Sequence, residues 1–364
     1  MAVDLKKLLS SRKFLPIYIG RKNADKRFLG PVAVEFHWTS KCNYKCIHCS
    51  YSSRRRIKKN LSDEVIRSVI GDLINLKTQG VYLSGGGEPT TVEGWAGYAG
   101  QLMRHGIETA LITNGAALKK SHLSVLRNMN YIAISIYSDD EGEYRQITGG
   151  RSFNKQFDLP SMIKDEGNRT VVGARCVLNR INYRRVVSIY QRAMDAHFDY
   201  IIFIPSVDYE DANVSLSHDE MDTVQSIVRE YYGIFDFSRT NIDSLLERKI
   251  RHYEAADYRM DFSAPPAECR AVSIRGNAFI NYDGGVYLCQ PHIGDPRFCI
   301  GDVTETTFNQ IWNSKRHCEV IDILNKQFTE GLCKNCRSIN FNKAADVYDK
   351  NPSPIADITK DVFI

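Results

Sequence analysis

The chain contains no apolar run long enough to be a signal peptide or to cross a membrane. Its N-terminus, MAVDLKKLLSSRKFLPIYIG, carries positive charge but no such run. We therefore expect a cytoplasmic protein without a membrane partner. Because the cytoplasm is reducing, the ten cysteines are not expected to form disulfides. Metal ligation or catalysis should account for most of them.

The sequence also lacks internal repeats, low-complexity tracts and any interleaving of basic with aromatic residues. These absences argue against a repeat architecture and a nucleic-acid groove, so we expect no nucleic acid among the partners. The net charge of +5 is modest, and its one concentration is RRRIKK at 54–59. This run is either a solvated loop or a surface that attracts an anionic substrate or an acidic electron donor.

The composition is that of a globular protein able to bury a sizeable core. The 364 residues, 43% apolar and 25% charged, favour one large and one small domain. Six short β-branched runs alternate with amphipathic stretches, one of which predicts a helix from its N-cap Ser62 to Leu76. The runs are 32–38, 81–85, 108–114, 131–137, 171–178 and 200–205. This alternation predicts an α/β fold, a partial (β/α)6 TIM-like barrel with functional loops after its strands.

A shift in composition divides the rest of the chain. Pro265 and Pro266 mark a boundary. A β-hairpin turning at 283–285 and a helix over about 306–324 then predict a small α+β domain. We expect five segments, namely an N-terminal extension (1–30), the barrel (31–216), a helical linker region (217–262), the small C-terminal domain (263–340) and a surface tail (341–364).

Three cysteines are crowded into TSKCNYKCIHCS, residues 39–50, just after the first predicted strand. They are Cys42, Cys46 and Cys49, and no fourth cysteine is nearby. A structural zinc site needs four ligands, and His48 lies between two of the cysteines and closes a tetrahedron with them poorly. A 4Fe–4S cluster held by three cysteines instead leaves one iron free for a small chelating ligand. The missing thiolate is therefore interpreted as an open coordination position.

With this spacing at this place, the chain resembles the radical S-adenosylmethionine (SAM) superfamily. The family signature is Cys-x3-Cys-x-aromatic-Cys, and His48 stands in the aromatic place, where it would contact the adenine. The resemblance implies a 4Fe–4S cluster whose free iron is chelated by SAM. An electron from a reductant such as flavodoxin or ferredoxin would pass through the cluster and cleave SAM. The 5′-deoxyadenosyl radical formed would abstract hydrogen from a substrate.

The sequence after the second predicted strand, SGGGEP, also matches the superfamily. Gly86, Gly87, Glu88 and Pro89 stand where the family has GGEP. Glycines let a backbone approach a ligand closely, and Glu88 with backbone acceptors can hold the ammonium group of SAM. Taken alone, the glycines would indicate only a turn.

Three further residues resemble cofactor-lining positions of the family. Asn114 belongs to TNG after the third strand, Ser135 ends the fourth, and Arg145 follows in EYRQITG. The resemblance implies that Ser135 touches the ribose or methionyl end. It implies that Arg145 pairs with the methionyl carboxylate, for which its fork of donors is suited. Each also has a structural interpretation, as a turn asparagine, a strand-end serine or a helix-surface arginine. The fifth strand fits the family's adenine-contacting pattern poorly.

Four more cysteines are grouped in the predicted small domain, and a zinc ribbon is their structural interpretation. They are Cys269, Cys289, Cys333 and Cys336. Their layout, with Gly284 between the first two, resembles the twitch form of the SPASM domain. The resemblance implies one auxiliary 4Fe–4S cluster saturated by four protein thiolates. Such a cluster suits electron transfer better than direct ligation of substrate.

Three cysteines remain. Cys318 lies on a helical pattern and is expected in the core, and Cys299 has no evident partner. Cys176 on the fifth strand is the candidate hydrogen donor, should its side chain face the barrel cavity. We favour a buried structural thiol, because a reactive cysteine needs a special environment.

The tail motifs GDV, IWNS and LCKNC resemble those of twitch enzymes of the 2-deoxy-scyllo-inosamine dehydrogenase type. The expected activity is therefore that of an oxidoreductase that dehydrogenates a small molecule, such as a sugar, aminocyclitol or nucleotide. The alternatives are a radical epimerase or maturase of a ribosomally made peptide, and a non-enzymatic zinc-binding interaction protein. Only 41 residues precede Cys42, too few for a winged-helix leader-binding domain, which favours the small molecule.

Overall fold

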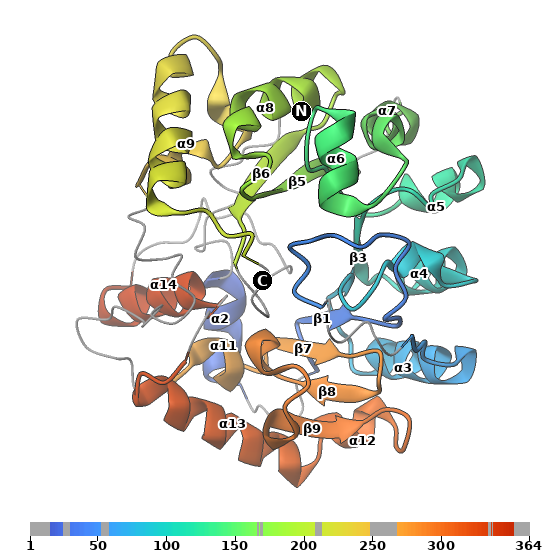
Figure 1. Cartoon of the computed structure of the whole chain (residues 1–364). Helices are drawn as coiled ribbons and strands as arrows, with labels where there is room; N and C mark the ends of the chain where they lie inside the picture. Colours follow the sequence, from blue (N-terminus) through green and yellow to red (C-terminus); the bar gives the residue numbers. More distant parts are fainter. Residues whose placement is uncertain are drawn as a thin grey trace.

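The strands form one continuous sheet (Figure 1). The computed structural model describes residues 15–24, 30–51, 58–165, 167, 170–207, 213–247, 268–333, 336 and 338–352. Its nine-stranded sheet has the order β6-β5-β4-β3-β2-β1-β7-β8-β9. The strands are β1 (Ala33–Phe36), β2 (Gly80–Leu83), β3 (Glu108–Thr113), β4 (Tyr131–Ser135), β5 (Val171–Leu178), β6 (Tyr200–Pro205), β7 (Asn277–Ile280), β8 (Gly285–Tyr287) and β9 (Cys299–Asp302).

Strands β1 to β6 are all parallel and follow the six expected runs. Helices connect them on the outer face of the curved sheet (Figure 1). These are α3 (Asp63–Asn75), α4 (Trp95–Arg104), α5 (Leu123–Leu126), α6 (Glu141–Thr148), α7 (Phe153–Ile163) and α8 (Val186–Asp195). As expected, Ser62 caps α3 by accepting the Val65 N–H. The expected partial TIM-like barrel is confirmed.

The two faces of each barrel strand differ in burial, which separates the core from the open interior. In β5, Ala174, Cys176 and Leu178 are fully buried, whereas Arg175 and Val177 are half-buried. Because side chains alternate along a strand, the first set faces the helices and the second the barrel interior. The apolar core therefore lies between sheet and helices, and the inner face of the described sheet is accessible.

The C-terminal strands extend the barrel sheet beyond β1. β7 pairs parallel to β1, while β8 and β9 continue in antiparallel order. The hairpin between β7 and β8 turns at the expected place. There Gly284 has a φ of 106°, and a Cβ on it would lie 2.1 Å from Asp302 Oδ1. The small domain is therefore built onto the barrel edge, where it also protects β1 from edge pairing.

The expected single helix over 306–324 is wrong, because the structure has two helices there. α12 (Phe308–Trp312) and α13 (Lys315–Thr329) are separated at 313–314. Each begins with its own N-cap, since Thr307 accepts the Gln310 N–H and Ser314 accepts the His317 N–H. Because Ser314 caps a new helix, α12 does not continue into α13.

The tail expected from residue 341 begins with a packed helix instead. α14 (Ile339–Lys350) lies against α2 (Leu15–Lys22) and α11 (Arg270–Ser273), as the red and blue helices of Figure 1 show. Asp349 accepts hydrogen bonds from Arg270 at 2.8 Å and from Tyr18 at 2.5 Å. The buried side chains of Phe341 and Asn342 anchor the helix. A surface tail is therefore wrong for residues 341–350.

The helical region after β6 is confirmed in part. α9 (His218–Tyr231) begins with a capping box between Ser217 and Glu220 and packs against α8, and α10 (Ile242–Glu247) follows. The boundary at Pro265 and Pro266 lies outside the described residues, and the five segment limits remain predictions. Among the described residues, no helix combines the length and hydropathy needed to span a membrane.

Candidate active site and auxiliary metal centre

The loop after β1 carries Cys42, Cys46 and Cys49, all half-buried. Backbone hydrogen bonds attach this cysteine loop to the C-terminal end of α6. The Lys45 N–H donates to Thr148 O at 2.8 Å, and the Ile47 N–H donates to Ile147 O at 2.9 Å. The cysteine loop follows β1, but it is fixed in place by hydrogen bonds to α6, which follows β4.

Gly86 and Gly87 bring the loop after β2 against the backbone that leads to Cys42. A Cβ on Gly86, whose φ is 61°, would lie 2.4 Å from Thr39 O, and one on Gly87 would lie 2.0 Å from Lys41 O. The Gly87 N–H donates to Thr39 O at 2.7 Å. These glycines are required because two segments of the chain approach each other closely. The predicted approach to a ligand remains a prediction.

Glu88 is a buried hub between the loops after β2 and β3. Its Oε1 accepts hydrogen bonds from the Thr90 hydroxyl at 2.6 Å, the Thr113 hydroxyl at 2.7 Å and the Thr90 N–H at 3.2 Å. Its Oε2 accepts the Asn114 N–H at 2.8 Å. Burial raises the pKa of Glu88, and these donors oppose the rise. The carboxylate holds the site together, and its contact with the SAM ammonium remains a prediction.

Pro89 starts a short 3-10 helix and accepts the Trp38 Nε1–H through its carbonyl at 3.1 Å.

Asn114 lies next to the cysteine loop, and its predicted contact with the cofactor remains a prediction. Its Nδ2 donates to Asn43 Oδ1 at 2.7 Å and lies 4.0 Å from Cys42 Sγ. Its Oδ1 accepts the Ala116 N–H at 3.0 Å, which sets the orientation of the amide. Asn114 therefore connects the end of the third strand to the segment that carries Cys42.

Tyr137 is the site residue that the sequence analysis missed. The centroid of its ring lies 4.7 Å from that of the His48 ring, and the side chain of Ser135 is near enough to lower its pKa. Burial, together with the charge of nearby Cys46, raises the pKa of Tyr137 well above its usual value. Tyr137 thus joins His48 and Ser135 into one group beside the cysteine loop. Only its position two residues after Ser135 signals this in the sequence.

Two of the predicted site residues, Arg145 and Cys176, lie outside the group beside the cysteine loop. Arg145 is exposed on α6, where its Nη2 donates to Glu141 Oε1 at 2.6 Å. This surface pair does not support contact with the methionyl carboxylate, which stays a prediction. Cys176 faces the helices, with its Sγ 3.8 Å from Asn182 Nδ2. That placement supports a buried structural thiol and not a hydrogen donor in the barrel interior.

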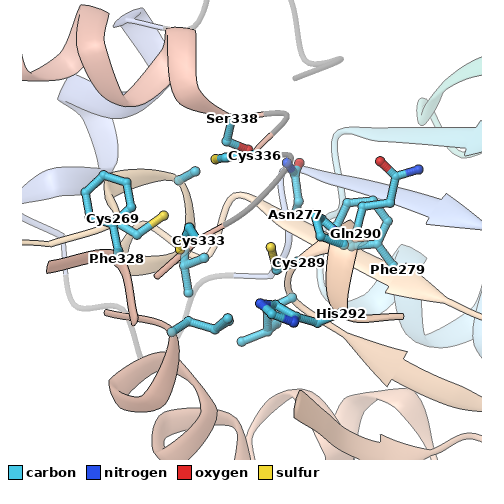
Figure 2. Close-up of a pocket in the computed structure, with 15 residues that line it drawn as sticks. Cys269, Asn277, Phe279, Cys289, Gln290, His292, Phe328, Cys333, Cys336 and Ser338 are labelled. Carbon is cyan, nitrogen blue, oxygen red and sulfur yellow. The ribbon is translucent and has the colours of Figure 1, made fainter. Parts of the chain in front are cut away.

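The second cysteine set surrounds one pocket in the small domain (Figure 2). Cys269, Cys289, Cys333 and Cys336 all line it, with their sulfur atoms around a common space. They come from the start of α11, the end of the β8 segment and the stretch after α13. The rest of the wall is mostly apolar, with Ala271, Val272, Phe279, Leu288, Pro291, Leu324 and Phe328, and also contains the polar residues Asn277, Gln290, His292 and Ser338.

This donor set fits an iron–sulfur cluster. Burial, followed by the charges of the other three cysteines, raises the pKa of Cys289. Burial likewise raises the pKa of Cys333 to about 11 and that of Cys336 to about 12. Four thiolates in one mostly apolar pocket need a multiply charged cationic core to stabilise them. The four sulfur atoms surround a space too wide for a single metal ion, since no three His, Cys, Asp or Glu side chains among the described residues are grouped closely enough to share one.

The remaining two cysteines lie outside this pocket. Cys299 donates to Gly301 O at 3.2 Å within β9. Cys318 is exposed on α13, so the expectation of a core position is wrong. Its Sγ lies 3.9 Å from Arg275 Nη2.

Comparison with known proteins identifies the two parts. The family model described as "Radical SAM superfamily" matches residues 37–193, and the "Iron-sulfur cluster-binding domain" model, SPASM, matches residues 269–337. The protein is therefore a radical SAM enzyme, and it belongs to the radical SAM superfamily with a C-terminal SPASM domain. A 4Fe–4S cluster that binds SAM, an auxiliary 4Fe–4S cluster and SAM itself are its cofactors.

Curated relatives match most of the chain at low identity. The Fe-coproporphyrin III synthase of Methanosarcina barkeri is 23% identical over 82% of this chain and 77% of its own length. The mycofactocin maturase MftC of Mycolicibacterium smegmatis is 27% identical, with 84% and 75% covered. The cysteine-type anaerobic sulfatase-maturating enzyme of Clostridium perfringens is 24% identical, with 82% and 84% covered.

Solved structures confirm the fold. Streptococcus suis SuiB bound to S-adenosylmethionine has a TM-score of 0.61 at 15% identity, covering 91% of this chain and 78% of SuiB. The anSMEcpe structure with bound AdoMet has a TM-score of 0.58 at 16% identity, covering 88% of this chain and 93% of the other. The likeness to both extends over barrel and small domain alike.

Proposed function

We propose that this enzyme oxidises a peptide substrate and that the auxiliary centre accepts the electron left on the substrate. The observation that carries the oxidative assignment is the pocket lined by Cys269, Cys289, Cys333 and Cys336. Four protein thiolates leave no iron of a 4Fe–4S cluster open to substrate. Such a centre is suited to electron transfer.

The barrel residues bind and orient the reactive cofactors. Cys42, Cys46 and Cys49 would ligate three irons, and SAM bound at the fourth supplies the 5′-deoxyadenosyl radical that removes a hydrogen atom. The hydrogen bonds of Glu88 and Asn114 hold the cysteine loop and two strand ends in fixed relation. A fixed geometry matters because hydrogen transfer requires the reacting atoms to be close and aligned.

The peptide assignment is supported by the names of the relatives. Two of the three curated relatives above are maturases, and each aligns with more than four-fifths of this chain. SuiB is also solved bound to its precursor peptide SuiA, with a TM-score of 0.61 to this chain. These likenesses favour the peptide over the small molecule expected from the tail motifs.

A small polar molecule is the second candidate, and the barrel interior favours it. Arg175 lies within electrostatic reach of Tyr131, Tyr200, Tyr82 and Glu35, which come from four different strands. The rings of Tyr82 and Tyr131 are 6.4 Å apart across the intervening β3. A half-buried guanidinium among hydroxyl groups is suited to a compact substrate rich in oxygen, such as a sugar or a nucleotide.

The edge of the barrel also restricts how a peptide could bind. Asn241 donates to Phe203 O at 2.9 Å and accepts the Phe203 N–H at 2.8 Å, so its amide occupies the free edge of β6. A peptide cannot add to β6 at this point as a further strand without displacing that side chain. A peptide substrate would therefore enter the interior end-on or as a loop.

The test uses cell extract divided into a peptide fraction and a small-molecule fraction. Reduced holoenzyme is incubated with SAM and each fraction, and 5′-deoxyadenosine release is measured. We expect the peptide fraction to stimulate release, protease treatment to abolish the stimulation, and a peptide to lose two hydrogen atoms by mass spectrometry. Stimulation confined to a protease-resistant small-molecule fraction would overturn the peptide assignment and support the second candidate.

The electron-acceptor role is tested separately. The Cys333→Ala/Cys336→Ala variant should lose product formation yet still release 5′-deoxyadenosine, because the barrel site is intact. Unchanged product yield in this variant would contradict the oxidative assignment. A flavodoxin or ferredoxin remains our proposed reductant, and replacing dithionite with either one tests it.

A further inference from the structure

One side chain donates a hydrogen bond to a cysteine of the auxiliary pocket from outside the matched SPASM region. Asn342 on α14 is fully buried, and its Nδ2 lies 3.4 Å from Cys269 Sγ. The family match ends at residue 337. This contact therefore comes from a helix that neither the sequence motifs nor the family model includes.

The orientation of the Asn342 amide is determined by a second contact. Its Oδ1 accepts the backbone N–H of Ala271 at 3.2 Å. A backbone N–H can only donate, so the carbonyl oxygen must face Ala271 and the amide NH2 must face the sulfur. A metal-bound thiolate carries no proton, and the bond therefore runs from Asn342 to Cys269.

The contact distinguishes Cys269 from the other three ligands. The amide of Asn342 is within hydrogen-bonding distance of Cys269 Sγ, at 3.4 Å. Among the described residues, only Asn342 offers a side-chain donor to any of these four sulfurs.

We propose that Asn342 is a positioning residue that raises the reduction potential of the auxiliary cluster. Reduction adds negative charge to a cluster, and a hydrogen bond to a ligating sulfur stabilises the more negative state. The bond thereby favours acceptance of an electron at the Cys269 side of the pocket. Its consequence for turnover rests on the proposed oxidative function, but its effect on the potential does not.

The experiment measures the auxiliary cluster alone. In the Cys42→Ala/Cys46→Ala/Cys49→Ala background, the reconstituted full chain carries only that cluster, and its potential is followed by an EPR-monitored redox titration. Asn342→Leu removes the donor at similar size. We expect the equilibrium constant for reduction to fall about tenfold, which is about 59 mV for a one-electron couple. Iron and sulfide content should stay unchanged.

Asn325→Leu is the matched control. Asn325 accepts the Cys269 N–H through its Oδ1 at 2.9 Å, so it contacts the same ligand without touching the sulfur. Its replacement also removes a contact to Cys269 but should leave the potential unchanged. Asn342→Asp is a second variant that removes the amide donor while keeping an oxygen that accepts the Ala271 N–H. It replaces Asn342→Leu in the experiment if the leucine variant loses its cluster.

The outcomes separate the two proposals. A lowered potential in the Asn342 variants, with none in Asn325→Leu, supports the role of Asn342. An unchanged potential, or an equal shift in the control, overturns it. If the potential falls but product formation in otherwise wild-type enzyme does not slow, the role of Asn342 stands and the cluster is not the electron acceptor that we propose.

Discussion

Glu88 is a buried carboxylate that holds two loops of the site together, and we predict that it also binds the cofactor. Its four hydrogen bonds join Thr90, Thr113 and Asn114 beneath the cysteine loop. We expect Glu88→Ala to weaken SAM binding at least about tenfold, because hydrogen bonds to a charged group contribute roughly 1.5–3 kcal/mol each. Anaerobic equilibrium dialysis measures the affinity.

Two further variants make the Glu88 test specific. Glu88→Gln keeps the shape but turns an amide donor toward the donors around it, and should also bind SAM more weakly. Glu64→Ala changes an exposed carboxylate at the start of α3 and should bind normally. If both Glu88 variants bind SAM with wild-type affinity, Glu88 has only a structural role in the turn after β2.

Cys176 was the candidate hydrogen donor, and its burial among the core residues now argues against that role. We expect Cys176→Ala to retain turnover within about twofold and to lose about 1 kcal/mol of unfolding free energy. Cys318→Ala, at an exposed position, is the control and should change neither quantity. Loss of product with continued 5′-deoxyadenosine release, together with solvent deuterium in the wild-type product, would instead identify an epimerase with Cys176 as donor.

At the scale of the element, a buried neutral histidine bridges the break between α12 and α13. His317 Nδ1 lies 2.6 Å from Trp312 O, so the neutral ring donates its Nδ1–H to that carbonyl. Burial, with Arg275 nearby, lowers the pKa of His317 to about 4. The unfolded chain, with a histidine pKa of about 6.5, therefore binds this proton first as the pH falls. The contribution of His317 to the free energy of unfolding is therefore fully present above pH 6.5 and is lost as the pH falls toward 4.

This difference in pKa predicts a pH dependence. Between pH 7 and pH 6 the group should remove about 0.7 kcal/mol from the unfolding free energy. Urea unfolding at the two pH values measures it, and the difference should vanish in His317→Asn. His105→Gln, on the exposed end of α4, should keep the wild-type dependence. A dependence that survives in His317→Asn would assign it to another group.

At the scale of the whole molecule, the continuous sheet connects the two iron–sulfur sites. β1 leads into the cysteine loop, and its neighbour β7 starts the hairpin that ends at Cys289. The His37 N–H donates to Ile280 O at 2.8 Å, so the hydrogen bonding between β1 and β7 continues up to the cysteine loop. The two sites are therefore attached to neighbouring strands of one sheet, which fixes their relative positions.

The cluster content of the whole protein is the corresponding prediction. Anaerobically reconstituted wild-type protein should contain about eight irons, and the Cys42→Ala/Cys46→Ala/Cys49→Ala variant about four. Only the wild type should release 5′-deoxyadenosine from SAM, slowly, without substrate. Zinc near two per chain with no labile sulfide would contradict both cluster assignments and restore the zinc-binding alternative.

The sequence by itself determined the class of the protein and most of its fold. Strand and helix periods are local properties, and so are the spacings Cys42-x3-Cys46-x2-Cys49 and Cys333-x2-Cys336. Six parallel strands, the hairpin at Gly284 and the gathering of four distant cysteines in one pocket followed from these patterns. Local chemistry is enough where a ligand needs fixed residue types at fixed spacing.

Only the tertiary structure decided which partner each side chain meets. Glu88 is surrounded by donors from two loops, Cys176 faces the helices, and Tyr137 lies on His48. Asn342 reaches Cys269 because α14 folds back onto α11. These contacts join residues far apart in the chain, and no local period encodes which of them will meet. Burial and register are collective properties of the packed sheet and helices, so they are defined only once the chain has folded.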